Sequence, residues 1–300
     1  MFIRRLPRFE YHAPASVREA LECLSQYEGK AKVLAGGTDL LVAMKKREAA
    51  PEHLINLKGI EALKTILYDP KEGLRIGSLA TIGDIERSQV VREKYAPLWD
   101  AVRVMAAPQV RNLGTLGGNL CSAVPSADTA PPLIALGASV RLVGINGERS
   151  VPVEAFFKGP GQSVLKADEI MVEVLVPNPP AHSGGAYFKL MRRNAMDLAL
   201  VGVAVFLRLA DAKRACSEAR IALGAVAPTP IRAPMAEHVL VGKEVTEDVA
   251  AEAGNVASRE ARPITDVRTS EGYRRLMVGV LTKRATLEAF NRIRHRGVGL

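Results

Sequence analysis

The stretch Val33-Leu-Ala-Gly-Gly-Thr-Asp39 and the related stretch Thr115-Leu-Gly-Gly-Asn119 decide the fold prediction. A strand-like apolar run, 32–35, enters the first glycine pair and a helix-like run, 39–45, leaves it, with Thr38 predicted as N-cap. Glycine lacks a Cβ, so the main chain can approach an anion closely. The N-terminal end of a helix also favours a phosphate. Two such turns predict that bare main-chain amides on both sides hold a ligand with two phosphates, such as a dinucleotide.

Composition limits the class of protein. The chain has 300 residues, 48% hydrophobic and 24% charged, as expected for a soluble globular protein of two domains. Its longest apolar stretch, 198–207, is about half a membrane span, and the basic N-terminus lacks the apolar core of a secretory signal. We therefore expect a cytoplasmic protein without a membrane span. The net charge of +9 is dispersed and has no interleaved aromatic residues, which argues against nucleic-acid binding.

A proline- and glycine-rich segment, 177–185, predicts the linker between two domains. Before it, short strands and helices predict a small α/β unit followed by a second unit. In that second unit we expect a strand at 80–82 and a helical stretch over 83–105 that breaks at Pro97. After the linker we expect strands of an antiparallel sheet and then helices, at 187–191, 201–209, 218–223, 234–240, 246–258 and 271–294. The last helix is predicted to bury an apolar stripe that includes Tyr273 and Leu276.

The motifs of many catalytic classes are missing from the sequence. There is no P-loop, no G-x-G-x-x-G fingerprint and no zinc-spaced cysteine or histidine set, so we assign no catalytic residue and no metal site. Phosphate-binding turns without an acid–base set suit a protein whose cofactor does the chemistry. Cys121 is either a small packing residue near the ligand or a redox thiol. The three cysteines are too few for the four ligands that an iron–sulfur cluster needs.

In this order and spacing, the motifs resemble those of a known family, the flavin-binding medium subunits of molybdenum hydroxylases. That family includes carbon monoxide dehydrogenase and xanthine dehydrogenase. The resemblance covers nearly the whole chain and rests on the segments 35–39, 111–121, 126–132, 188–197, 224–230 and 273–277.

The resemblance implies an α+β fold with two domains. Residues 1–177 would form a two-lobed FAD-binding domain of the vanillyl-alcohol-oxidase/PCMH type, with lobes of about 1–57 and 58–177. Residues 183–295 would form an antiparallel sheet-and-helix domain of the CO dehydrogenase flavoprotein C-terminal type.

The resemblance also implies a function. The chain would be an oxidoreductase subunit that takes electrons from a 2Fe-2S partner and passes them through FAD to an external acceptor. Molybdopterin and the 2Fe-2S clusters would lie in a large and a small partner subunit, arranged with this chain as a dimer of heterotrimers. The substrate and the terminal acceptor are not specified by this chain.

The same resemblance assigns residues to the cofactor. The two turns would grip the FAD pyrophosphate, Asp128 would accept hydrogen bonds from ribityl hydroxyls, and Lys189 would reach the flavin region. Met171 would contribute mainly a backbone contact. The full predicted set of FAD-binding residues is Leu34, Ala35, Gly36, Gly37, Thr38, Asp39, Thr115, Leu116, Gly117, Gly118, Asn119, Asp128, Met171 and Lys189.

Two departures from the family pattern and two alternatives stay open. Met105 stands where xanthine dehydrogenases have an aromatic near the flavin, and the cysteine-bearing insertion of 4-hydroxybenzoyl-CoA reductases is missing. A stand-alone FAD-dependent oxidoreductase of related fold would need a proton donor beside the flavin, and the sequence does not point to one. A binding module that has lost flavin would not need the glycines that this chain keeps.

Overall fold

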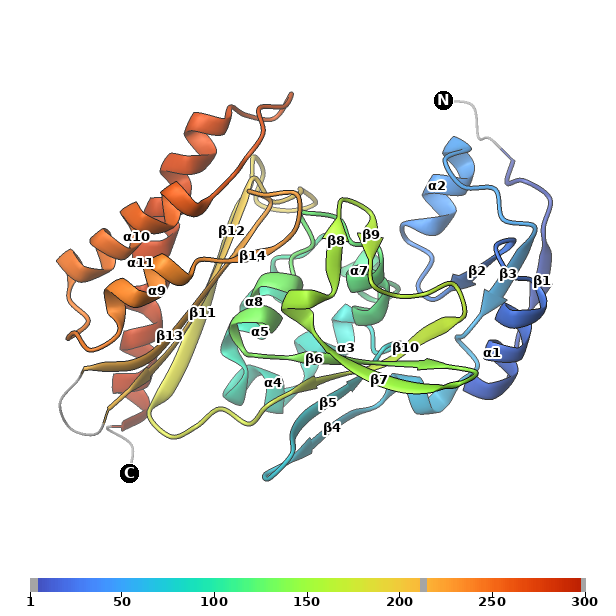
Figure 1. Ribbon diagram of the computed structural model, residues 1–300, viewed down its shortest axis with the longest axis horizontal. Coiled ribbons are helices and arrows are strands. Elements are labelled where there is room, and N and C mark those ends of the chain that lie inside the picture. The colour runs from blue at the N-terminus through green and yellow to red at the C-terminus, as the bar shows by residue number, and fades with distance from the viewer. Residues whose placement is uncertain (1–4, 211–214, 298–300) are drawn as a thin grey trace.

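The computed structural model describes residues 5–210 and 215–297, so residues 1–4 of the predicted first lobe lie outside the described part. Figure 1 shows the three larger sheets in chain order, from the N-terminal lobe in blue to the C-terminal domain in yellow, orange and red. No helix within the described ranges has both the length and the hydropathy needed to cross a bilayer.

The N-terminal lobe is a small three-stranded parallel sheet with two helices. Its elements are β1 (Glu10–His12), α1 (Val17–Gln26), β2 (Ala31–Leu34), α2 (Leu40–Lys46) and β3 (His53–Asn56), and the strand order is β1-β3-β2. Ser16 caps α1, because its side chain accepts a hydrogen bond from the amide of Glu19. The apolar face of α1 packs against β3 in a buried cluster that also includes Ile170 and Val172 from further along the chain.

The second lobe is built on a five-stranded antiparallel sheet of order β4-β5-β10-β6-β7, with a β8-β9 ribbon beside it. Its strands are β4 (Ile66–Asp69), β5 (Gly73–Gly77), β6 (Ser139–Gly144), β7 (Gly147–Pro152), β8 (Phe157–Gly159), β9 (Gln162–Ser163) and β10 (Glu169–Val176). Its helices are α3 (Ile82–Arg87), α4 (Gln89–Lys94), α5 (Ala96–Arg103), α6 (Pro108–Arg111), α7 (Leu116–Cys121) and α8 (Ala130–Ala135), with 3-10 turns at Glu61–Lys64 and Val153–Ala155.

Two predictions for this lobe are wrong. Instead of a strand over 80–82, Thr81 makes a single bridge to Thr115 and caps α3 through a capping box with Asp84. The helical stretch over 83–105 is three helices, because Ser88 caps a new one and the chain turns again at Tyr95. Pro97 therefore lies in the first turn of α5, where its missing N–H costs nothing.

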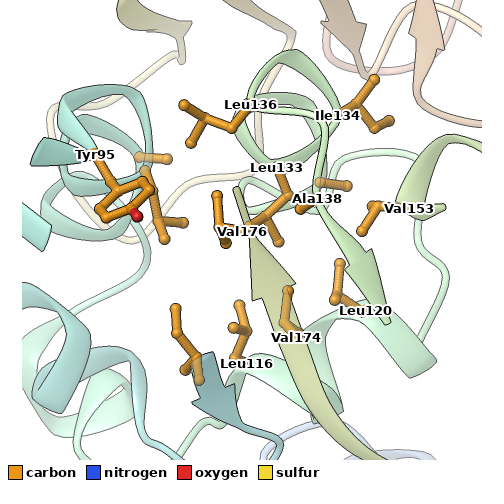
Figure 2. Close-up of a cluster of buried hydrophobic side chains, with 14 of the residues drawn as sticks. Tyr95, Leu116, Leu120, Leu133, Ile134, Leu136, Ala138, Val153, Val174 and Val176 are labelled. Atoms are coloured by element: carbon orange, nitrogen blue, oxygen red, sulfur yellow. The ribbon is translucent and has the colours of Figure 1, made fainter. Parts of the chain in front are cut away.

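The core of the second lobe lies between its sheet and its helices. Figure 2 shows Leu116 and Leu120 from α7, Leu133 from α8 and Val174 from β10 in one buried cluster, to which Ile134 of α8 also belongs. All five side chains are at most 3% exposed. Burial of each side chain of this size stabilises the fold by roughly 1.5–3 kcal/mol, so this cluster holds α7 firmly in place.

The C-terminal domain consists of a four-stranded antiparallel sheet, buried on both faces, and three helices. Its elements are β11 (Ser183–Leu190), β12 (Val201–Leu209), β13 (Cys216–Gly224), β14 (Ile231–Arg232), α9 (Pro234–Leu240), α10 (Glu247–Glu260) and α11 (Glu271–Gly297), and the strand order is β11-β12-β13-β14. Along β12, Val203 and Val205 face the core under α9–α11, whereas Ala204 and Phe206 face the core of the second lobe. The sheet thus belongs to two cores, which explains the continuous apolar run of 201–209.

The linker between the domains is shorter than the predicted segment 177–185. Residues 183–185 form the start of β11, because Gly184 and Gly185 let neighbouring elements come close. A Cβ on Gly185 would lie 2.6 Å from Pro97 of α5, and one on Gly184 would lie 2.8 Å from Ile293 of α11. These glycines are therefore packing residues of a strand.

Candidate functional site

The structure brings the two predicted glycine turns together. A Cβ on Gly36 would lie only 2.1 Å from the carbonyl oxygen of Leu113, in the loop just before the second turn. Ser122, directly after α7, donates a hydrogen bond of 2.8 Å to the carboxylate of Asp39 at the start of α2. In Figure 1, α2 and α7 face each other across the gap between the lobes. The two turns thus form one site with a wall from each lobe.

The first turn offers unused main-chain donors. Within the described residues, the amides of 36–39 donate no hydrogen bond to protein atoms. Gly37 adopts a positive φ of 78°, a conformation that side chains rarely tolerate. Consecutive amides left free by such a turn form a concave cluster that binds anions.

The predicted N-cap of the helix after this turn is wrong by one residue. The cap of α2 is Asp39, in a right-handed conformation and without a side-chain hydrogen bond to the helix. No side chain satisfies the first amides of α2, although the Leu41 amide donates to the carbonyl oxygen of Gly37.

The second turn differs from the first, because the amides of residues 116–119 already donate to protein atoms. The amide of Leu116 donates to Ala80, that of Gly117 to Ser78, and that of Asn119 to Thr115. The amide of Gly118 donates to the side chain of Thr115, which caps α7. The expectation that bare main chain acts on both sides therefore fails for this turn.

Side chains supply the donors of the second turn. The Thr115 hydroxyl accepts from Gly118 and still has its own proton to donate. The Asn119 oxygen accepts a bond of 2.6 Å from Thr129, which leaves the Asn119 amino group free to donate. The second turn can thus bind a phosphate or a ribose, but through side chains.

Packing fixes the orientation of α7. Leu116 and Leu120 point into the core in Figure 2, so Gly118 and Ser122, two positions further on, lie toward the other side of the helix. Gly117 is required for packing, since a Cβ there would lie 2.7 Å from Ser78. A Cβ on Gly118 would meet only the Thr115 hydroxyl, at 2.9 Å.

Asp128 and Lys189 form a buried ion pair that joins the two domains. The Lys189 ammonium lies 2.8 Å from one carboxylate oxygen of Asp128, and the Tyr187 hydroxyl donates to the other at 3.0 Å. The side chains of Lys189 and Asp128 are 1% and 7% exposed. Lys189 and Tyr187 are two positions apart on β11, so they share a face of the strand.

Burial governs the electrostatics of this pair. Burial raises the pKa of Asp128, and the charge and hydrogen bond of Lys189 act in the opposite direction. Burial, followed by the charge of Asp128, raises the pKa of Tyr187 well above its ordinary value. Tyr187 therefore stays a neutral hydrogen-bond donor at physiological pH.

The remaining predicted residues lie in or near the cores. Leu34 ends β2 and is buried, and Ala35 packs against the core of the first lobe. The Met171 side chain lies in the core of the second lobe, where β10 has a register shift between Met171 and Glu173. Cys121 keeps some exposure, but burial raises the pKa of its thiol to about 12, so it does not form a reactive thiolate at neutral pH.

Three contributors to this site were missed from the sequence, namely Ser122, Tyr187 and Thr129. Tyr187 could have been found, because strand periodicity places it beside Lys189. No pattern pointed to Ser122 or Thr129, since each is an ordinary polar residue whose partner lies in another segment.

Comparison with known proteins agrees with this architecture. The family described as the FAD binding domain in molybdopterin dehydrogenase matches residues 7–179, and the CO dehydrogenase flavoprotein C-terminal domain matches residues 186–289. The chain is 39% identical over 286 residues to the carbon monoxide dehydrogenase medium chain of Hydrogenophaga pseudoflava, covering 95% of this chain and 98% of that one. It is 32% identical over 280 residues to the xanthine dehydrogenase FAD-binding subunit of Escherichia coli O157:H7, covering 93% of this chain and 95% of that one.

Solved structures show the same fold. Carbon monoxide dehydrogenase from Hydrogenophaga pseudoflava superposes with a TM-score of 0.92 at 40% identity, over 96% of this chain and 99% of that chain. Quinoline 2-oxidoreductase from Pseudomonas putida 86 superposes with a TM-score of 0.90 at 32% identity, over 96% and 99% of the two chains.

The fold and the paired turns define a two-domain flavoprotein subunit of an oxidoreductase. The chain belongs to the family of FAD-binding medium subunits of molybdopterin dehydrogenases.

Proposed function

We propose that this chain is the electron-transfer subunit of its complex, which receives electrons from a 2Fe-2S partner subunit and passes them through FAD to an external acceptor. A large molybdopterin subunit would react with the substrate, and the three chains would form a dimer of heterotrimers. The cluster of free amides at 36–39, beside the α7 wall, is the observation that carries the FAD assignment. FAD suits this place in a chain of carriers because it accepts electrons singly or in pairs.

The residues fit the diphosphate of FAD. The amides of 36–39 would donate to the phosphate oxygens, because backbone donors in a concave turn match an anion without desolvating a charged side chain. The Thr115 hydroxyl and the Asn119 amino group would donate from the opposite wall. Gly118 would leave room for the nucleotide, since only the Thr115 hydroxyl lies near the position of its Cβ.

The ion pair between the domains would serve the flavin end of the cofactor. A ribityl hydroxyl would donate to lone pairs of Asp128 that Lys189 and Tyr187 leave free, because a carboxylate has about four acceptor sites. Lys189, whose charge is paired with Asp128, would place its ammonium near the ring. The backbone at Met171 would line the same region, next to the register shift of β10.

A matched pair of glycine variants tests the role of the first turn. Gly37 and Gly29 have similar positive φ angles, 78° and 73°, so alanine imposes similar backbone strain at each. A Cβ at Gly37 would in addition lie 3.2 Å from the side chains of Leu34 and Leu41, whereas one at Gly29 would meet no atom within 4 Å. Gly37→Ala should weaken FAD binding by more than ~10-fold, because a displaced turn loses charged hydrogen bonds of roughly 1.5–3 kcal/mol each. Gly29→Ala should keep the FAD affinity of the unchanged protein.

The test is to measure the FAD content and the FAD dissociation constant of each purified variant. Equal affinities in the two variants would show that the first turn does not hold the diphosphate. Isolation of the native complex tests the wider role, since molybdenum and iron should copurify with this chain. A flavoprotein that purifies alone and oxidises a small substrate directly would instead support the stand-alone oxidoreductase.

A further inference from the structure

Glu10, His12 and His53 form a cluster on the N-terminal lobe, away from the proposed FAD site. One ligand atom of each side chain lies within 4.8 Å of the others. The His12 Nε2 and His53 Nδ1 atoms are 3.1 Å apart, and His53 Nδ1 is 3.4 Å from a Glu10 carboxylate oxygen. Neither histidine belongs to the proposed FAD site.

The strand register builds this cluster. Glu10 of β1 lies opposite His53 of β3 in the parallel pair. His12 lies two positions after Glu10 and therefore points to the same face of the sheet. All three side chains thus share the face that α1 covers, at the end of the helix marked by Tyr27.

The aromatic ring of Tyr27 fixes both imidazoles. It stacks on His53 with ring centroids 3.8 Å apart and an interplanar angle of 13°. It also stacks on His12 with centroids 4.9 Å apart. The nitrogens are therefore held in place, which lowers the entropic cost of binding a ligand between them.

Hydrogen bonds among these three side chains cannot satisfy both short contacts of His53 Nδ1 at once. An imidazole nitrogen has one in-plane position, which carries either a proton or a lone pair. His53 Nδ1 can therefore accept from His12 or donate to Glu10, but it cannot do both. A cation between the three atoms would use the two nitrogen lone pairs and the carboxylate together.

The distances match a zinc-like ion. Two ligands bound to one tetrahedral zinc at about 2.0–2.1 Å lie about 3.3 Å apart. Two of the three separations, 3.1 and 3.4 Å, fall on either side of this value, and the third, between Glu10 and His12, is at most 4.8 Å. The Glu10 side chain is 71% exposed and that of His53 is 12% exposed, so an ion can reach buried nitrogens through an open side.

We propose that Glu10, His12 and His53 bind a divalent first-row transition metal of the zinc class, with water in the remaining position. Two imidazoles and one carboxylate are a ligand set that zinc, nickel and copper prefer over magnesium or calcium. The ion would join β1 to β3 and so stabilise the edge of the N-terminal lobe.

Calorimetric titration of the full-length protein with ZnCl2 tests this site. We expect one equivalent of Zn²⁺ to bind and the melting temperature to rise with Zn²⁺ concentration, because the metal binds the folded state. His12→Gln and His53→Gln should each weaken Zn²⁺ binding by more than ~10-fold and remove the shift in melting temperature. Glu10→Gln, a change at an exposed side chain, should weaken binding without affecting folding.

His238→Gln is the matched control, because His238 is exposed on α9 in the other domain. FAD content reports whether each variant has folded. The proposal is overturned if the unchanged protein binds no Zn²⁺, if both histidine variants at the site bind it as before, or if His238→Gln weakens binding equally.

Discussion

At the scale of single residues, the glycines of the two turns have different physical roles. Gly37 provides a positive φ, Gly36 allows the two lobes to touch, and Gly117 packs against Ser78. Sequence reasoning treated all of them as phosphate contacts, since composition alone does not separate these roles. The structure distinguishes them through the atoms that an added Cβ would meet.

The buried ion pair between Asp128 and Lys189 is expected to contribute to the stability of the protein. Asp128→Asn should lower the free energy of unfolding by about 3–5 kcal/mol, because it leaves a buried ammonium without its counter-charge. The double variant Asp128→Asn with Lys189→Met should recover much of this loss, since no charge is then buried. Urea unfolding of both single variants and the double variant measures the coupling, and strictly additive losses would contradict it.

At the scale of elements, sequence periodicity located most strands and helices but misjudged their faces and ends. Segments 201–209 and 234–240 match β12 and α9, because strong apolar runs and a first-turn proline are local signals. The predicted stripe of α11 was partly wrong, as Tyr273 and Leu276 are 44% and 62% exposed. Small residues such as Ala285 face the sheet instead, because the helix packs closely.

Arg274 shows what a periodic pattern cannot reveal. Its side chain is 2% exposed, donates to the carbonyl oxygens of Leu200 and Ala225, and lies 2.9 Å from Asp266. This cationic residue is thus the centre of a buried network. Only the tertiary arrangement supplies these partners, so the sequence could not indicate them.

The ion pair between Asp266 and Arg274 of α11 predicts that the stability of the protein depends on pH. Hydrogen bonds from Arg268 hold the pKa of Asp266 below its ordinary value, with a further contribution from the charge of Arg274. The folded state thus favours the ionised form, so the stabilisation is present above about pH 4 and is lost as the pH falls. Asp266→Asn should cost about 3 kcal/mol near pH 7, since it leaves Arg274 buried without its counter-charge.

Chemical unfolding of this variant near pH 7 and near pH 3 measures the effect. The difference from the unchanged protein should shrink at the lower pH. A difference that stays constant with pH would show that the ionised Asp266 does not stabilise the fold.

At the scale of the whole molecule, the domains share more than the sequence indicated. The linker was predicted because proline and glycine cluster there, yet β11 begins inside it. The C-terminal sheet is covered by α5 and α8 on one face and α9–α11 on the other. The sequence predicted two domains but not this shared core, since contacts between distant segments leave no local pattern.

An ion pair across the interface between the two domains is expected to stabilise the whole protein. Arg292 of α11 lies 2.6 Å from Asp100 of α5, and Asp100 also accepts from the Tyr187 amide. Arg292→Met should destabilise the protein by about 2–5 kcal/mol, because Asp100 is then buried with only one partner. Arg284→Met, an exposed arginine on the same helix, should have little effect.

Urea unfolding followed by the fluorescence of Trp99, the single tryptophan, reports on this interface because Trp99 lies in α5. Equal stability of the two arginine variants would mean that the interdomain ion pair contributes nothing measurable.

The central claim is that the main-chain amides of the first turn, rather than those of the second, hold the diphosphate of FAD. A structure of the FAD-bound complex tests it most directly. Phosphate oxygens should lie within ~3.2 Å of the amide nitrogens of residues 36–39, with the Thr115 hydroxyl on the opposite wall. A diphosphate bound by the amides of residues 116–119, or away from both turns, would contradict the account.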